Sequence, residues 1–196
     1  MLEESLAIAK EIDDYPGMAR SSLQLGDLYQ EKGDDRRAQV FNEQALRIAE
    51  SVDDATLSAL ACQQLGVLAQ QREDWPEAQQ RYQHGLTYCR TSGQRNTLAL
   101  LLHQLGQVFY QQGQFDAARQ SLEESFQVNT ELRNREAMAG TLHQLAWVAA
   151  EEGHMDEARH WCKQSIALLE AIGSPNLDTA RASLTEFERG AAGGKH

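Results

Sequence analysis

The sequence predicts an all-α fold, an α-solenoid of four complete helix pairs with a leading half-repeat helix and a C-terminal capping helix. Nearly the same seven residues, such as HQLGQVF at 103–109 and HQLAWVA at 143–149, recur at intervals of forty residues. Each period holds two amphipathic helical segments joined by a short turn, and the two ends of the chain depart from the repeat.

Columns of small residues define the repeat. One column pairs leucine with glycine or alanine: Leu25-Gly26, Leu65-Gly66, Leu105-Gly106 and Leu145-Ala146. A second column contains only alanine: Ala38, Ala78, Ala118 and Ala158. Small side chains at helical spacing let two backbones approach closely, and larger apolar residues fill the space between them. The columns therefore predict packing and carry no chemistry.

The first helix of a period is clearest in the third repeat, where apolar residues fall at spacings of four, three and four: Leu98, Leu102, Leu105 and Phe109. This spacing predicts one buried helix face. Gly113 follows, as Gly33 and Gly153 do in their periods, and supplies the left-handed residue that a helix C-terminus favours. In the second repeat Glu73 takes this place.

The second helix begins almost at once. Asp34 and Asp74 stand where an N-cap side chain accepts hydrogen bonds from unpaired amides, and Pro76 lies just inside a helix start. Two helices of about 16 residues joined by a short turn cannot bury both apolar faces alone, so neighbouring pairs must stack.

The period sets the predicted boundaries: repeats at 14–53, 54–93, 94–133 and 134–173. Residues 1–13 are predicted to be the second helix of an incomplete repeat, because LEESLAIAK at 2–10 matches LEESFQVNT at 122–130. Residues 174–189 form a predicted capping helix with one apolar face: Leu177, Ala180, Leu184 and Phe187. Residues 190–196 are predicted to be a flexible tail.

The leading helix has an apolar face without its partner helix, and an exposed apolar end of a solenoid tends to associate with other surfaces. Either a longer natural protein supplies the missing helix or another copy of the chain covers the face. The first alternative is favoured, so we expect the C-terminal part of a larger protein. The second predicts a homodimer through the N-terminal half-repeat.

The Leu-Gly pair, an aromatic residue three positions after the glycine (Tyr29, Phe109), the inter-helix glycine and the small-residue columns together resemble tetratricopeptide repeats. The forty-residue spacing, in place of the usual spacing of roughly 34, is similar to the longer-helix variant of kinesin light chains, Leu-Gly-Asn repeat proteins and the sensor arms of bacterial signal-transduction ATPases. The resemblance covers residues 1–173, departs at Glu73 and Ala146, and implies a right-handed α–α superhelix.

The resemblance also implies that one face of each first helix lines a concave surface. The predicted partner-binding residues on it are Arg20, Leu23, Asp27, Gln30, Leu60, Gln63, Val67, Gln70, Leu100, His103, Gln107, Tyr110, His143 and Trp147. These columns vary between repeats while the packing columns do not, which favours a bound peptide or helix whose side chains differ along its length. Variation could instead mark only solvent exposure. Trp147 argues against this alternative, because an indole is costly to leave in water.

An invariant column of amides lies beside the varied one: Gln24, Gln64, Gln104 and Gln144. An amide both donates and accepts, so the column could bind the main chain of an extended ligand or bridge adjacent helices, and bridging is favoured. The family's clamp for C-terminal carboxylates needs several basic residues. Only Arg20 is basic on this face, so binding of chaperone tails is not expected.

Composition excludes several function classes. The 29 acidic and 18 basic residues give a net charge of −11, which repels nucleic acids and anionic membranes and favours a neutral or basic partner. Cys62, Cys89 and Cys162 lack disulfide or zinc spacing, which indicates reduced thiols in a cytoplasmic protein. No apolar run approaches the roughly 20 residues of a membrane span, and acidic residues stand where a signal peptide needs basic ones.

Catalytic and metal-binding interpretations find little support. His103 and His143 occupy equivalent positions, but no carboxylate or thiol accompanies them, and zinc needs three or four ligands. No nucleotide-binding, zinc-protease or nucleophile motif is present, so no cofactor or metal is expected. We therefore expect a non-enzymatic module that binds a peptide or helix of a partner protein in the groove. The alternative is a regulatory sensor arm of a signalling ATPase or transcription regulator, which binds a small effector or an intramolecular segment.

Overall fold

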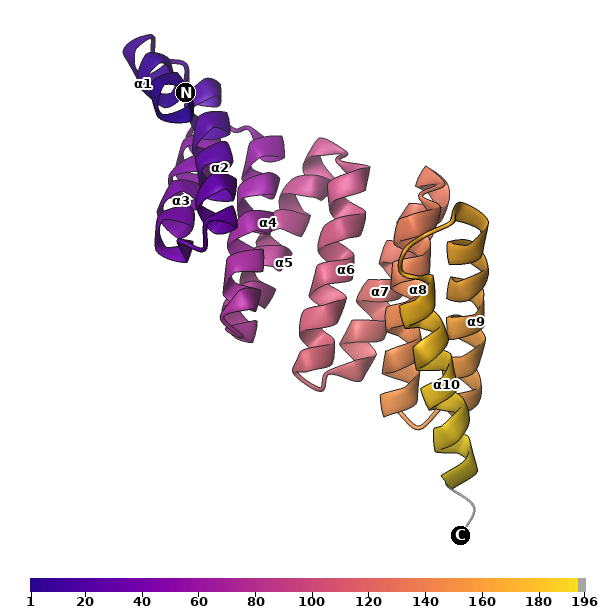
Figure 1. Ribbon diagram of the computed structural model, residues 1–196. Coiled ribbons are helices and arrows are strands. Elements are labelled where there is room, and N and C mark those ends of the chain that lie inside the picture. The colour runs from indigo at the N-terminus through magenta and orange to yellow at the C-terminus, as the bar shows by residue number, and fades with distance from the viewer. Residues whose placement is uncertain (194–196) are drawn as a thin grey trace. The chain divides into compact units, whose positions relative to one another are not determined.

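The computed structural model describes the backbone of residues 1–193 and the side chains of residues 1–189, and within this range every regular element is a helix (Figure 1). The helices are α1 Leu2–Glu11, α2 Tyr15–Glu31, α3 Asp35–Ser51, α4 Ala55–Gln71, α5 Trp75–Ser92, α6 Arg95–Gln111, α7 Phe115–Leu132, α8 Arg135–Glu151, α9 Met155–Ile172 and α10 Leu177–Gly193. The predicted all-α class is confirmed. Helix α10 continues past the predicted end at residue 189, and residues 194–196 of the predicted tail lie outside the described residues.

The chain divides into two compact units, Met1–Leu101 and Leu102–His196, with the division inside α6. In the first unit α2 packs against α3 and α4 against α5, and α3 packs against α4 as the next layer. In the second unit α8 packs against both α7 and α9, and α10 packs against α9. Each unit is therefore a stack of helical hairpins, as the forty-residue period predicts.

Each described turn between helices contains a residue in the left-handed backbone region: Asp13, Gly33, Asp53, Glu73, Gly93, Gly113, Arg133, Gly153 and Gly173. An acceptor side chain often follows directly and caps the next helix. Asp34 accepts the amide N–H of Arg37 at 3.1 Å and Asp74 accepts that of Glu77 at 3.2 Å, which confirms both predicted N-caps. Glu73 adopts φ 58°, so it takes the same conformation as the glycine it replaces.

The glycine column lets each first helix lie close to its second helix. A methyl group on Gly26, Gly66 or Gly106 would overlap the side chain opposite it, which is Asn42, Tyr82 or Leu122. In the fourth repeat Ala146 replaces the glycine, and the opposite position holds the small Cys162 in the same buried cluster. A larger residue at this position of the first helix is thus accompanied by a smaller side chain at the facing position of the second helix.

The apolar face of α10 packs on the second unit. Ala180 lies in a buried cluster with Ala139 and Leu169, and Phe187 lies in another with Ala146 and Cys162. Ser183 and Ala180 are almost fully buried on the same face. This end of the unit is therefore closed by a helix with a polar outer side. No helix among residues 1–193 is both long and apolar enough to cross a membrane.

Candidate functional site

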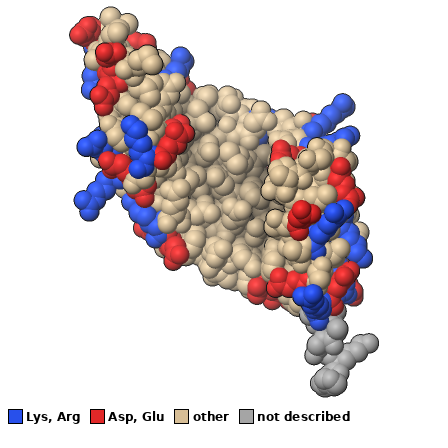
Figure 2. Space-filling model, in the orientation of Figure 1, with Lys and Arg blue, Asp and Glu red and all other residues tan. Residues whose placement is uncertain are grey.

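The exposed side of α4 carries a row of uncharged side chains in the first unit. Leu60, Gln63, Val67 and Gln70 lie on successive turns and are each half-buried. We call these four residues the α4 face. Helix α4 contains no Asp, Glu, Lys or Arg between Ala55 and Gln71, and Figure 2 shows an uncharged surface over it. The α4 face thus offers apolar contact and side-chain amides without a formal charge.

Helix α2 contributes less to this side than the sequence predicts. Arg20 and Asp27 are exposed, but Leu23 is only 6% exposed and packs in a cluster with Ala45 and Cys62. The prediction that Leu23 lies on a partner-binding surface is wrong. Helices α3 and α4 both pack against α2, and they enclose the leucine between them.

Several predicted site residues bridge neighbouring helices. The Gln64 amide donates to Asp27 Oδ1 at 2.5 Å and so links α4 to α2. This is the bridging role that the sequence favours for the glutamine column. Gln30 donates to Gln71 Oε1 at 3.2 Å, and the Tyr82 hydroxyl donates to Gln70 Oε1 at 2.8 Å. Burial raises the pKa of Asp27, while the hydrogen bond from Gln64 lowers it.

The second unit carries the corresponding residues of α6, which are His103, Gln107 and Tyr110 and which we call the α6 face. The Thr141 hydroxyl donates to the Ala137 carbonyl at 2.8 Å and lies 3.3 Å from His103 Nδ1. The hydroxyl proton is thus committed, so Nδ1–H donates to Thr141 and Nε2 is left as an acceptor. Burial lowers the pKa of His103, which keeps this imidazole neutral at pH 7.

Tyr110 lies at the border of the α6 face. Its hydroxyl donates to Glu151 Oε1 at 3.2 Å, and its ring packs at 5.9 Å from the ring of Phe115. Burial and the neighbouring carboxylate of Glu151 raise the pKa of Tyr110 to about 12. The hydroxyl is therefore a neutral donor that is already engaged within the protein.

Trp147 and His143 are covered by α10. The Trp147 ring meets that of Phe187 edge-on, with ring centroids 4.9 Å apart, and His143 Nε2 lies 2.9 Å from Ser183 Oγ. Burial lowers the pKa of His143. The capping helix of the same chain therefore buries part of the indole, which weakens the argument that Trp147 would be costly to leave exposed without a partner.

Charge is separated between the first and second helices of the second, third and fourth repeats, although not in the first repeat, where α2 carries Arg20, Asp27 and Glu31. The repeat columns alone do not reveal this separation. Three stretches contain no Asp, Glu, Lys or Arg: 55–71, 96–115 and 137–150. They cover α4, most of α6 and most of α8, whereas α3, α5, α7 and α9 each carry acids and bases. Figure 2 shows uncharged surface over α6 as well as α4. A count of charge by segment would have found this signal in the sequence.

The three cysteines are buried thiols. Burial raises the pKa of Cys62 to about 12 and those of Cys89 and Cys162 to about 11. All three remain thiols at neutral pH, and thiols are poor nucleophiles. Within the described part of the chain, no three His, Cys, Asp or Glu side chains are grouped as metal ligands.

Stacked hairpins held by small-residue columns define a helical-repeat scaffold, a class of protein that presents extended binding surfaces. The tetratricopeptide repeat profile matches residues 1–51, 55–131 and 97–171, and the chain belongs to this family. No curated protein matches the sequence significantly.

Solved structures share the fold at low sequence identity. BtubC (BKLC) from P. vanneervenii is 18% identical with a TM-score of 0.74, over 100% of this chain and 91% of that one. The TPR-like repeats of a Podosopora anserina protein described as a kinesin light chain are 18% identical with a TM-score of 0.75, over 90% and 88%. Aspartyl phosphate phosphatase F from Bacillus subtilis is 13% identical with a TM-score of 0.80, over 95% of this chain and 48% of that one.

Proposed function

We propose that the chain is a protein-interaction module that binds an uncharged segment of a partner protein along its first helices. The observation that supports this most directly is the α4 face, a row of Leu, Gln and Val on a helix without charge in a chain of net charge −11. Solvated surface helices carry charge, as α3 and α5 do. A charge-free exposed side is typical of a contact surface, because charged residues are depleted at the centre of interfaces.

The chemistry of the α4 face defines the partner segment. Leu60 and Val67 offer apolar contact, and Gln63 between them can donate to and accept from a main chain. Leu100, which is 42% exposed, adds a further apolar contact in the first unit. The acidic residues nearby, Asp27 and Glu31, favour a basic residue next to the bound segment and disfavour an acidic one. The α6 face of the second unit has the same neutral character.

Peptide selection tests the proposal and does not require that the natural partner be identified first. Random peptides displayed on phage are selected on the intact chain, and individual peptides are then measured by fluorescence anisotropy. We expect selected peptides with few acidic residues, and we expect Val67→Glu and Gln63→Glu to weaken their binding at least tenfold. Val40→Glu is the matched control, because Val40 is 58% exposed on α3 and lies off the α4 face.

Salt dependence separates the proposal from general attraction to an acidic protein. Binding to an uncharged face should change less than threefold between low and high ionic strength, since few charges are paired. Binding that falls tenfold in salt and resists Val67→Glu would contradict the proposal.

The alternative role as a sensor arm would need a small-molecule site only if it bound a small effector. The pocket between α8, α9 and α10, lined by Glu136, His143 and Thr179, holds only about 170 Å³. Ligand pockets usually have volumes of roughly 300–1,000 Å³. This pocket is therefore small for an effector site. An intramolecular segment in place of the partner peptide would use the α4 and α6 faces.

A further inference from the structure

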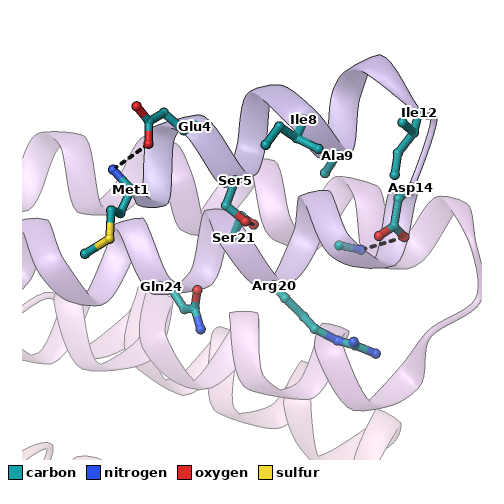
Figure 3. Close-up of a pocket in the computed structure, with 11 residues that line it drawn as sticks. Met1, Glu4, Ser5, Ile8, Ala9, Ile12, Asp14, Arg20, Ser21 and Gln24 are labelled. Carbon is teal, nitrogen blue, oxygen red and sulfur yellow. Dashed lines mark hydrogen bonds and ion pairs between the residues drawn. The ribbon is translucent and has the colours of Figure 1, made fainter.

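A groove of about 570 Å³ runs between α1 and α2 at the N-terminal end of the first unit (Figure 3). Ile8 of α1 and Ile12, which directly follows α1, border it and are 57% and 67% exposed. Ser5 and Ser21 meet between the two helices with their hydroxyl oxygens 3.1 Å apart. Because these hydroxyls pair with each other, each has a hydrogen-bond partner within the protein.

The same chain contains a second copy of this groove, displaced by forty residues, between α3 and α4. Ile48 and Ala49 replace Ile8 and Ala9, and Ala45 and Ala61 replace the two serines. There the occupant is visible, because α2 lies in the groove. Two α2 residues spaced by four, Ala19 and Leu23, join its buried cluster: Ala45, Leu46, Ala49, Leu57, Ala61, Cys62 and Leu65. Ile48 packs against that cluster, in contrast to the exposed Ile8.

A polar contact fixes the position of α2 along the internal groove between α3 and α4. Gln64 of α4 donates to Asp27 of α2, which stands four residues after Leu23. In the N-terminal groove the equivalent amide belongs to Gln24, which is exposed and projects from α2 beside Arg20 (Figure 3). Arg20 stands where the internal groove has Leu60, so the N-terminal groove adds a positive charge next to the amide donor.

The acids of the groove interact with groups other than Arg20. The Asp14 carboxylate accepts the amide N–H of Gly17 at 3.0 Å, and Glu4 pairs with the N-terminal amino group at 3.3 Å. Arg20 is exposed, and no ion pair found among the described side chains includes it. A carboxylate on an incoming helix would therefore meet both Gln24 and Arg20, and a charge-assisted pair is the stronger kind of hydrogen bond.

We propose that the groove between α1 and α2 binds an amphipathic helix of a partner protein, whose docking face carries a small residue, an apolar residue four positions later and a carboxylate four positions after that. This pattern is that of Ala19, Leu23 and Asp27 in the internal groove. The site is separate from the α4 face and does not depend on the proposed function.

The probe that tests the site is an acetylated and amidated, fluorescently labelled peptide of residues 15–31, the sequence of α2, titrated with the intact chain. We expect saturable binding. A peptide with Leu23→Ala should bind at least tenfold more weakly, because the apolar anchor is lost. A peptide with Asp27→Asn should bind several-fold more weakly, because Arg20 and Gln24 lose their charged acceptor.

Variants of the intact chain locate the binding. Ile8→Glu and Ile12→Glu should each weaken binding at least tenfold, whereas Val40→Glu, an equally exposed apolar-to-acid change on α3, should leave it unchanged. Gln24→Leu combined with Arg20→Ala should abolish the difference in affinity between the unmodified peptide and the peptide with Asp27→Asn, as a double-mutant cycle requires for groups in contact. Circular dichroism of each variant verifies its helical content.

Three results would overturn the proposal. The first is absence of binding by the peptide of residues 15–31. The second is binding that Ile8→Glu and Ile12→Glu leave intact, since the peptide would then have exchanged with α2 in the internal groove. The third is concentration-dependent self-association of the chain that Ile8→Glu abolishes, because the occupant would then be a second copy of the chain. Failure of the peptide selection on the α4 face would not affect any of these outcomes.

Discussion

Gly66 lies directly against the ring of Tyr82, so that a Cβ atom added at Gly66 would overlap Tyr82 Cε1. Tyr82 is fully buried and its hydroxyl donates to Gln70, so the ring cannot move away freely. The absent side chain of the glycine is therefore what allows α4 and α5 to pack. Gly106 and Leu122 repeat the relationship in the second unit.

Gly66→Ala should lower the free energy of unfolding by roughly 1–3 kcal/mol, the usual cost of overpacking a core. Gly140→Ala is the matched control, because Gly140 is a helical glycine with no atom within 4 Å of its added Cβ. The control should raise stability by about 0.5–1 kcal/mol, because alanine favours the helix. Urea unfolding followed by circular dichroism measures both. Equal effects of the two changes would contradict the packing role of Gly66.

Glu73→Gly should stabilise the protein by about 1 kcal/mol, because Glu73 is held at φ 58°, where a side chain is unfavourable. Gly113 occupies the equivalent turn at φ 71°, and Gly113→Ala should destabilise by a similar amount. Thermal unfolding of the two variants tests the pair. A loss of stability in Glu73→Gly would mean that the glutamate side chain makes a compensating interaction.

Asn42→Leu should stabilise the first unit by roughly 1–3 kcal/mol, the usual penalty of a buried polar group without a partner. Asn42 is fully buried opposite Gly26, and both polar atoms of its amide lack hydrogen-bond partners among the described residues. Leu122 fills the equivalent place in the second unit. For contrast, Asn129 donates to Ser125 at 3.3 Å, so Asn129→Leu should destabilise. Chemical unfolding of both variants decides whether the hydrogen bond makes the difference.

Stability should fall as the pH drops below about 6.5. Burial lowers the pKa of His103 and of His143 from the ordinary value of 6.5. Below that pH the imidazole is protonated in the unfolded chain but stays neutral in the folded chain. Each histidine therefore lowers the free energy of unfolding by up to about 1.4 kcal/mol per pH unit, until the pH reaches its folded-state pKa. Above 6.5 both states hold neutral imidazoles and the effect vanishes. Urea unfolding between pH 5 and 8 should show a smaller slope in His103→Gln and His143→Gln, and an unchanged slope would contradict this assignment.

Phe187→Ala should release α10 from the second unit at a cost of roughly 3–5 kcal/mol, because the ring is 2% exposed and packs against Trp147. In a background with Trp75→Phe and Trp161→Phe, the emission of Trp147 should shift to longer wavelength as the indole meets water. Thr185→Ala, on the exposed side of α10, should leave the emission unchanged. An unshifted spectrum in Phe187→Ala would mean that α10 does not shield Trp147.

The period of forty residues predicts the helices and their turns, because the fold repeats a local unit whose signals are themselves local. Asp34 and Asp74 show this, since a cap depends only on residues three positions away. The environments of Leu23 and Trp147 could not be predicted in this way. Their burial depends on how helices from neighbouring pairs rotate against each other, and α10 breaks the repeat that covers Trp147.

The candidate faces were predictable in part. The columns correctly separated packing residues from more exposed ones at Arg20 and Val67, and the bond from Gln64 to Asp27 is of the bridging kind favoured for the glutamine column. They did not reveal that Gln70 is already engaged by Tyr82. A long polar side chain can form a hydrogen bond with any suitable group within its length, and the spacing of residues in the sequence does not determine which group that is.

The left-handed residues between hairpins recur at forty-residue intervals, at Asp13, Asp53, Gly93, Arg133 and Gly173. Each junction thus has the same backbone form, although its side chain differs. Copying or excising the stretch between two such junctions would join ends of matching geometry, so the gene could lengthen or shorten by whole hairpins. Duplication or loss of a hairpin at these points would change the number of binding faces, and every turn would keep its present conformation.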